Sequence, residues 1–321
     1  MVIPHLISIT IAWIIDRIIG DPPDWPHPVR WMGNLITKLD LRLNRGKHKR
    51  LTGSLFLFIM IMIAFWLSFL LVWGAYQIHL ILGILVESII VATTIAQKDL
   101  GTAALRVYNP LSEGELQRAR FEVSMIVGRD TDNLDEEGIT RATVETVAES
   151  IGDGITAPLF WSLIGGAPLA IVYRAVNTCD SMVGYKNERY AEFGWASAKF
   201  DDILNWIPSR ITGYLMMITN DTPFMKKLEA MKHWRQDAKK HASPNSGFLE
   251  AAVALFLGVQ LGGINYYKGI ESKRALLGIK HRELEKKDIL HTIKIMRRAV
   301  AVFMIFLWIG GAIFVVTSAW I

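Results

Sequence analysis

Two long stretches without formal charge constrain the fold of this 321-residue chain more than any other feature. Residues 51–86 contain no Asp, Glu, Lys or Arg, and residues 299–321 contain none either. Within the first stretch, residues 54–73 read SLFLFIMIMIAFWLSFLLVW, which as a helix is long enough to span a hydrocarbon core of about 30 Å. Both stretches therefore predict membrane-spanning helices, at residues 54–73 and 299–317.

Other apolar segments are shorter or interrupted. We expect further spans at about residues 6–20 and 78–96, the second of which carries Glu87. Residues 155–173 hold two prolines and a Gly-Gly pair, and residues 247–264 are short and rich in glycine. We expect both as broken or re-entrant helices, because irregular backbone at membrane depth is tolerated only where protein or a cavity surrounds it.

The composition agrees with a chain that lies partly in lipid and partly in water. It is 51% hydrophobic, too apolar for an ordinary soluble domain, and 20% charged, too charged for a pure membrane bundle. The predicted fold class is an all-α integral membrane protein, a single embedded domain with about 4–6 transmembrane or re-entrant helices. A large helical and loop region, about residues 97–298, is expected to carry the functional site.

Lysine and arginine in the loops predict the orientation. Residues 38–50 hold six Lys or Arg against one acid, residues 226–240 hold six, and residues 268–298 hold ten against four acids. Because basic loops stay in the cytoplasm, these segments and most of residues 97–298 are expected on the cytoplasmic side of a multi-pass protein of the cell membrane. Lipid headgroups are the expected contacts of these basic segments. No nucleic-acid partner is expected, since no recognition motif accompanies the charge.

Several familiar kinds of site are excluded. The single cysteine, Cys179, rules out an intrachain disulfide and a cysteine-rich metal site. The chain has no G-x-x-x-x-G-K-[ST] sequence, so any nucleotide is not held by a P-loop. Zinc-type ligand spacing and a Ser-His-Asp signature are absent too.

A first polar cluster, DRIIGDPPDWPHPVRWMG, covers residues 16–33. Its four closely spaced prolines end a helix and stiffen an extended segment. That segment displays Asp21, His27 and Arg30 at the membrane surface. The pattern fits a rigid turn with a surface ion pair, or part of a binding site.

A second cluster, residues 124–154, ends in ETVAESIGDG and also contains Arg129. Residues four apart share a helix face, so Glu145 and Glu149 should project together, with Asp153 on a glycine-flanked turn after them. Such carboxylates suit Mg²⁺, a hard ion that recruits substrate phosphates. The alternative is an exposed acidic helix face. An apolar stretch follows immediately, and because unpaired charge near lipid is costly, this favours the metal site.

A third cluster covers residues 173–210 and mixes cations, carboxylates and aromatic side chains. Its candidate ligand-binding groups are Asp180, Tyr185, Lys186, Asn187, Arg189, Trp195, Asp202 and Arg210. The aromatic side chains could flank a large planar ligand or seat the segment at the membrane interface. A binding site is the preferred interpretation over a solvated loop.

A fourth cluster, SPNSGFLEAA, places Ser243 and Asn245 in a turn before a helix. These residues are suited to cap the helix, and a helix N-terminus is also a site where anions bind. Nearby Arg235, Lys239 and His241 support an anion site.

Taken in this order, the clusters resemble the cobalamin-biosynthesis CobD/CbiB family, the adenosylcobinamide-phosphate synthases. The matching strings are GDPPDWPHPVRWMG, SMIVGRDT, ETVAESIGDGITAPLFW, AVNTCDSMVGYKNERYAEFGWASAKFDD, IPSR and SPNSGFLEAA. They extend from about residue 16 to residue 263, and the DSMVGYKNERY…FGWASA string is specific.

The resemblance implies a membrane enzyme that joins the free propionate of adenosylcobyric acid to an amino-alcohol phosphate such as aminopropanol O-phosphate. The product would be adenosylcobinamide phosphate, with ATP as co-substrate and Mg²⁺ as cofactor. Other late cobalamin-assembly membrane enzymes are conceivable partners. A carboxylate condenses with an amine only after its oxygen becomes a leaving group, so such a site needs metal, phosphate-binding cations and a base.

We assign roles to the residues on that basis. The candidate metal ligands are Glu145, Glu149 and Asp153. The candidate catalytic residues are Glu145, Glu149, Asp180 and Lys186, together with His27 and Asp202, either of which would transfer protons. The candidate substrate- and phosphate-binding residues are Arg30, Arg129, Tyr185, Lys186, Asn187, Arg189, Trp195, Arg210, Ser243 and Asn245.

Two other functions stay open at this point. GDGITAP prompts a Mg²⁺-dependent membrane phosphotransferase of the CDP-alcohol type, although APLFWSLIGGAP lacks the glycine and aspartate positions which that signature requires. A non-enzymatic corrinoid carrier or scaffold would predict duplicated halves and functional charge inside the spans.

Overall fold

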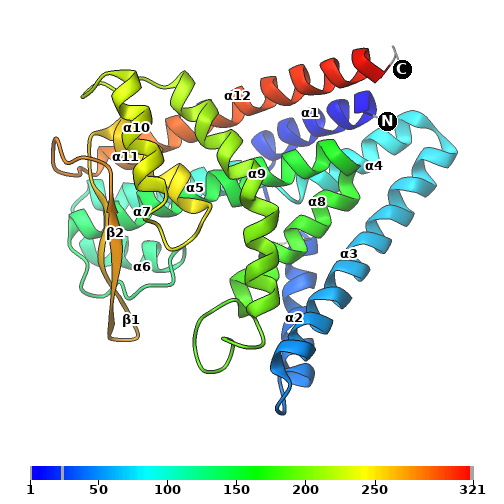
Figure 1. The fold of residues 1–321 in the computed structure, drawn as a ribbon, viewed down its shortest axis with the longest axis horizontal. Helices are drawn as coiled ribbons and strands as arrows, with labels where there is room; N and C mark the ends of the chain where they lie inside the picture. Colours follow the sequence, from blue (N-terminus) through cyan, green and yellow to red (C-terminus); the bar gives the residue numbers. More distant parts are fainter. Residues whose placement is uncertain (1, 23–24, 319–321) are drawn as a thin grey trace. The chain divides into compact units, whose positions relative to one another are not determined.

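The computed structural model describes residues 2–22 and 25–318, and most of them are helical (Figure 1). Pro23 and Asp24 of the proline-rich segment, and residues 319–321 of the last uncharged stretch, lie outside the described residues. The elements in chain order are α1 (Val2–Ile18), α2 (Pro28–Leu43), α3 (Lys49–Ile78), α4 (Leu80–Ala92), α5 (Gln97–Ser112), α6 (Leu116–Ser124), α7 (Glu136–Ile151), the π-helical turn η1 (Gly152–Thr156), α8 (Ala157–Val183), α9 (Trp195–Thr219), α10 (Lys227–Ala238), α11 (Ser246–Leu257), β1 (Leu261–Tyr267), β2 (Ile270–Leu277) and α12 (Lys287–Ser318).

The prediction of an all-α membrane protein is confirmed. Within the described residues, four helical runs are long and apolar enough to cross a membrane, namely Lys49–Ile78, Leu80–Ser112, Glu136–Val183 and Lys287–Thr317. The first and last contain the two predicted spans at residues 54–73 and 299–317. The third lies inside the region that we expected to be mostly cytoplasmic.

The chain forms two compact units that interleave in sequence. Unit 1 comprises Met1–Ala96, Asp153–Asn205 and Met304–Ile321, and unit 2 comprises Gln97–Gly152 and Trp206–Phe303. Each unit has its own buried side chains, and each is described here by itself.

Unit 1 is centred on α3 and α8, which pack against each other. Phe56, Val176 and Phe193 are fully buried between them, and the rings of Phe56 and Phe193 lie 5.2 Å apart. Gly53 permits this packing, because a Cβ at that position would lie 1.9 Å from the backbone oxygen of Phe193. The start of α3 is thereby tied to the loop that follows α8.

Glu87 of α4 is a fully buried carboxylate in unit 1. It accepts hydrogen bonds from Tyr76 OH at 2.6 Å, Ser8 Oγ at 3.2 Å and the backbone N of Ala167 at 3.1 Å, and its Oε1 lies 2.7 Å from His5 Nδ1. Since an unpaired charge among apolar helices is costly, these partners explain how the second predicted span carries an acid. Glu87 thus joins α1, α3, α4 and α8.

The expected break in residues 155–173 occurs at Gly165 and Gly166, where α8 has non-helical backbone angles. Gly166 has φ +63°, and a Cβ there would lie 2.2 Å from Glu87 Oε1. Glycine is required for both reasons, because it tolerates positive φ and leaves room for the carboxylate.

Unit 2 packs α7 and α11 against each other and against the antiparallel hairpin β1–β2 (Figure 1). Residues 247–264 are therefore not one broken helix. Gly258 ends α11 at φ +67°, and Gly262 and Gly263, at φ +90° and +89°, form an irregularity in the first strand. The hairpin is a small β element that the apolar pattern did not predict.

Candidate functional site

Helix α7 of unit 2 carries two of the predicted site carboxylates, Glu145 and Glu149. Asp135 caps its N-terminus by accepting a hydrogen bond from Gly138 N at 2.8 Å. Ile139, Val144 and Val147 are fully buried on one side of this helix, and Ala142 and Ala148 are fully buried on the side of Glu145, so α7 is enclosed on nearly all sides. Glu145 is consequently 2% exposed, while Glu149, one turn later, is half-buried.

Glu145 is bound on both carboxylate oxygens by protein donors. Arg129 Nη2 lies 2.5 Å from Glu145 Oε2, and the backbone N of Gly262 donates to Oε1 at 2.7 Å. Arg129, 8% exposed, also donates to Asn265 Oδ1 at 2.8 Å. Arg129, predicted as a phosphate ligand, and Glu145, predicted as a metal ligand, form a buried ion pair that joins α7 to the hairpin.

Glu149 lies beside the start of α11. Its Oε1 accepts a hydrogen bond from Ser246 Oγ at 2.8 Å. Ser243 Oγ accepts from the backbone N of Asn245 and of Ser246, each at 3.3 Å, and so holds the turn before this helix, whose N-cap residue Asn245 makes no side-chain capping hydrogen bond. The expected side-chain cap by Asn245 is therefore not formed, and Glu149 is bonded to the first residue of α11.

A second pair of side chains, His241 and Glu250, completes this cluster. His241 Nε2 lies 3.4 Å from Glu250 Oε1, and both side chains are buried. Burial, followed by the charges of Glu149 and Glu145, raises the pKa of Glu250 well above its usual range. Burial lowers the pKa of His241, so burial disfavours the charged form of both side chains.

Arg274 of β2 supplies a further cation. Burial opposes its charge, but Tyr267 and the carboxyl groups of Glu250, Glu145 and Glu149 outweigh burial and raise the pKa of Arg274. Its Nη2 donates to Tyr267 OH at 3.0 Å. We call these residues the unit 2 polar cluster: Arg129, Glu145, Glu149, His241, Ser246, Glu250 and Arg274.

Unit 1 contains a separate group, the unit 1 acidic cluster, made of Asp153, Tyr173, Asn177, Asp180, Asp201 and Asn205. Asp201 Oδ1 accepts from Asn177 Nδ2 at 3.2 Å, and its Oδ2 accepts from Asn205 Nδ2 at 3.0 Å. Tyr173 OH donates to Asn205 Oδ1 at 2.8 Å and lies 3.2 Å from the backbone oxygen of Asp153. Asp201 is 7% exposed.

Burial raises the pKa of Asp201, and the neighbouring Asp180 carboxylate raises it further, to about 7. A carboxyl with such a pKa can exchange a proton near neutral pH. The sequence assigned proton transfer to its neighbour Asp202, which is half-buried and lies 3.8 Å from Lys199 Nζ. Within unit 1, Asp201 is therefore the better candidate.

The loop after α8 is held mainly by internal contacts. Arg189 Nη2 lies 2.5 Å from Oδ2 of the buried Asp40, whose hydrogen bond and charge raise the pKa of Arg189. Asn187 Oδ1 accepts from the backbone N of Arg189 at 3.1 Å and of Tyr190 at 3.0 Å. Asn187 thus stabilises the turn, and Asp40 neutralises Arg189.

Three other predicted residues of this region are exposed. Tyr185 is 55% exposed, Trp195 is 47% exposed with Arg50 over its ring at 5.7 Å, and Lys186 is exposed. These side chains are open to a ligand.

The remaining predicted residues have local partners. His27 Nδ1 accepts from Val29 N at 3.3 Å at the start of α2, and its Nε2 lies 3.1 Å from Asp21 Oδ1. Arg30 is exposed on the same helix. Arg210 donates to the backbone oxygen of Trp206 at 2.7 Å and to Asn245 Oδ1 at 3.1 Å, so it braces the SPNS turn.

The predicted metal ligands do not lie in one unit. Glu145 and Glu149 belong to unit 2, whereas Asp153 and Asp180 belong to unit 1. Among residues 2–22 and 25–318, no group of three or more His, Cys, Asp or Glu side chains is arranged as a metal cage. Mg²⁺ often binds only one or two protein carboxylates together with substrate phosphates. Glu149 suits such a site better than Glu145, because both carboxylate oxygens of Glu145 already accept hydrogen bonds from protein donors.

Sequence reasoning missed the roles of Glu250, Arg274 and Asp201. One signal for Glu250 was present, because it is the only charged residue in Ser246–Leu257. A lone carboxyl in an apolar helix needs a partner, and here it is His241. Arg274 gave no such signal, since it lies among many cations of residues 268–298.

Comparisons with known proteins agree with the sequence resemblance. The family model described as CobD/Cbib protein matches residues 9–296. A protein of Halalkalibacterium halodurans named cobalamin biosynthesis protein CobD is 53% identical over 99% of this chain and 100% of its own length. Another so named, from Clostridium perfringens, is 43% identical over 91% of this chain and 93% of its own.

A Salmonella arizonae protein named cobalamin biosynthesis protein CbiB is 41% identical over 97% of both chains. No solved structure matches. The similarity to these proteins extends over 91–99% of the sequence, and the family model spans every polar cluster described above. The chain therefore belongs to the CobD/CbiB family.

Proposed function

We propose that this protein acts in cobalamin biosynthesis, as a membrane enzyme that forms an amide bond between adenosylcobyric acid and an amino-alcohol phosphate. The observation that carries the proposal is the similarity, over the full length, to proteins named for cobalamin biosynthesis. The product would be adenosylcobinamide phosphate when the amine is aminopropanol O-phosphate. We further propose a multi-pass protein of the cell membrane with the site on the cytoplasmic side, because the basic loops favour that orientation.

The proposed reaction consumes one ATP for each amide. The propionate carboxylate attacks the γ-phosphorus of ATP and releases ADP, which gives an acyl phosphate. The neutral amine then attacks the acyl carbon, inorganic phosphate leaves, and one proton passes from the ammonium to a base. The chain must therefore bind phosphates, position the carboxylate and accept that proton.

The unit 2 polar cluster supports this chemistry. Glu149 is half-buried and is oriented by Ser246, so it is the residue we propose to hold Mg²⁺. Mg²⁺ would supply charge neutralisation on the phosphates. Arg129 fixes Glu145 and the hairpin, which makes that pair a positioning element of the site.

Glu250 is the proposed proton carrier of this cluster. Burial raises the pKa of Glu250 and thereby favours the protonated carboxyl beside His241. A neutral carboxylic acid can donate a hydrogen bond where a carboxylate cannot, so Glu250 could protonate or bind a developing oxyanion.

The proposal is tested with purified protein in liposomes, adenosylcobyric acid, aminopropanol phosphate, ATP and Mg²⁺. We expect adenosylcobinamide phosphate by mass spectrometry, with one ADP per amide. Glu149→Gln should abolish turnover while the protein stays folded. The matched control is Glu137→Gln, an exposed acid on the first turn of α7, which should retain activity.

Other outcomes would favour other functions. Corrinoid movement across the liposomes without amide formation would indicate a carrier, and release of CMP from a CDP-alcohol would indicate a phosphotransferase. Near-normal turnover of Glu149→Gln would remove this residue from the metal site. Lys186→Ala should raise KM for ATP or for the amino-alcohol phosphate, and unchanged kinetics for both would show that Lys186 binds neither phosphate.

A further inference from the structure

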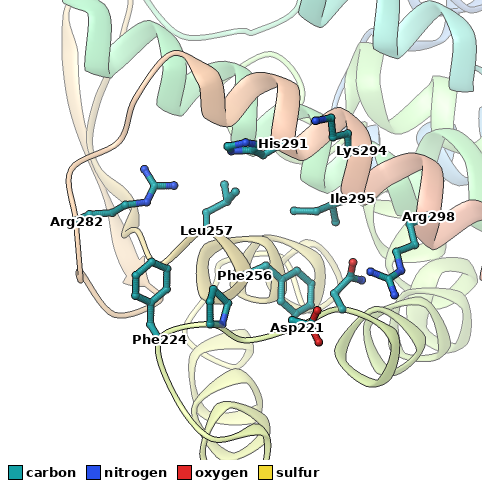
Figure 2. A pocket seen from close by; sticks show the side chains of 11 residues that line it. Asp221, Phe224, Phe256, Leu257, Arg282, His291, Lys294, Ile295 and Arg298 are labelled. Carbon is teal, nitrogen blue, oxygen red and sulfur yellow. The ribbon is translucent and has the colours of Figure 1, made fainter.

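A pocket outside the clusters described above lies entirely within unit 2. Its volume is about 450 Å³, and it opens between the first turns of α12, the end of α11 and the loop after α9 (Figure 2). Figure 2 shows Ile295 and Leu257 pointing into the pocket from opposite sides, with Phe224 and Phe256 along its floor. One part of the lining is therefore apolar.

The other part is basic. Arg282, Lys294 and Arg298 line the pocket together with His291, and Asp221 is the only carboxylate in the described lining. Arg282 is neutralised, because it forms two contacts with Asp288, at 2.8 and 2.5 Å. Within the described part of the chain, Lys294 and Arg298 make no hydrogen bond or ion pair.

A further cation, Lys227, lies close enough to Arg298 to feel its charge. Lys227 Nζ donates to the backbone oxygen of Asn220, another lining residue. Burial lowers the pKa of Lys227, Asp221 raises it, and the charge of Arg298 lowers it again. An anion placed between Arg298 and Lys294 would relieve this repulsion.

The backbone around the pocket is built to hold its shape. Gly258 ends α11 at φ +67°, and a Cβ there would lie 2.2 Å from the ring of Phe224. The Phe224 ring stacks on His281 with centroids 5.1 Å apart. His281 and Arg282 each donate a backbone hydrogen bond to the oxygen of Gly258. The apolar floor and the neighbouring cations are thus fixed relative to each other.

The position of the basic residues along α12 indicates the ligand. Lys294 and Arg298 lie in the last turns before residues 299–317, a stretch without charge in one of the four runs able to cross a membrane. Cations at such a boundary lie at the depth of lipid phosphates. A ligand with a phosphate and an adjoining hydrocarbon chain would match both parts of the lining.

We propose that this pocket binds one anionic membrane phospholipid, with Arg298 and Lys294 contacting its phosphate and Phe224, Leu257 and Ile295 contacting its glycerol and first acyl carbons. The site is distinct from the unit 2 polar cluster, since the two share no residue. A bound lipid would join α12, α11 and the loop after α9.

The test uses the full chain in a non-ionic detergent, where no charged membrane surface contributes. Short-chain phosphatidylglycerol is titrated and the bound fraction is measured by native mass spectrometry, with phosphatidylcholine of the same chain length and inorganic phosphate as separate ligands. The test variant is Arg298→Gln/Lys294→Gln. The matched control is Arg297→Gln/Lys287→Gln, which removes two exposed cations from the same helix outside the pocket.

We expect phosphatidylglycerol to bind the test variant roughly 30-fold more weakly, since each cation beside an anionic headgroup contributes about fivefold. The control should change by less than about threefold. Lys294→Gln alone, at an exposed position, gives the same comparison if the double variant does not fold, with about a fivefold loss expected.

Three results would overturn the proposal. Equal loss in the test and control variants would indicate diffuse attraction by the basic helix rather than a pocket. Equal binding of phosphatidylcholine would show that the anionic headgroup is not recognised. Displacement of the lipid by millimolar inorganic phosphate, with similar loss in the test variant, would identify a free phosphate as the ligand.

Discussion

Replacement of Asp201 by asparagine removes a carboxyl whose ionisation the native structure opposes. In the folded protein its pKa is raised from 3.8 to about 7 by burial and by Asp180. Between these two values the native state binds more protons than the unfolded state, so wild-type stability falls as pH rises through this window. At 1.36 kcal/mol per pKa unit, the full penalty above pH 7 is about 4 kcal/mol.

We expect the difference in unfolding free energy between Asp201→Asn and wild type to change with pH. Asparagine at this position can retain only one of the contacts from Asn177 and Asn205, which costs about 1 kcal/mol at every pH. The stability of Asp201→Asn relative to wild type should nevertheless rise by roughly 2.5 kcal/mol between pH 5 and pH 8, because only wild type acquires the buried charge.

Denaturant unfolding in detergent at several pH values measures this difference, with Asp202→Asn as the matched control on the next residue. The control should show the wild-type pH dependence. If Asp201→Asn unfolds with that same dependence, burial does not raise the pKa of Asp201 and the argument fails. If Asp201 also accepts a substrate proton, the limb of the rate profile near pH 7 should disappear in this variant alone.

Further predictions concern buried polar contacts. Arg129→Met should destabilise the protein by about 3–5 kcal/mol because Glu145 keeps a buried charge, and Arg129→Met/Glu145→Met should recover much of that loss; a double variant less stable than Arg129→Met in denaturant unfolding would contradict this. Glu87→Leu leaves the donors from α1, α3 and α8 without their acceptor, so its melting temperature should fall below that of Glu87→Gln, and equal melting would refute the role of the carboxylate. Gly166→Ala should lower the melting temperature more than Gly165→Ala, because only the first combines positive φ with a Cβ 2.2 Å from Glu87 Oε1; the reverse order would contradict the packing at this kink.

Much of the candidate site was predictable where the signal is local. Glu145 and Glu149 share a face of α7 because four residues make about one helical turn, and the SPNS segment forms a turn directly before α11. The pairing of Glu145 with Arg129 was not predictable in the same way. It depends on a hairpin whose Gly262 and Asn265 lie more than a hundred residues away along the chain.

The sequence alone determined the membrane class of this protein and its family. Uncharged stretches must leave water, and the family strings are specific without any knowledge of contacts. The tertiary structure decided which charges are neutralised and which titrate, because burial and partners brought from distant segments set a pKa. It paired Arg189 with Asp40, buried Glu250 beside His241 so that the pKa of Glu250 is raised, and moved the pKa of Asp201 towards neutrality. It also placed Lys294 and Arg298 in an apolar-floored pocket that no linear pattern indicates.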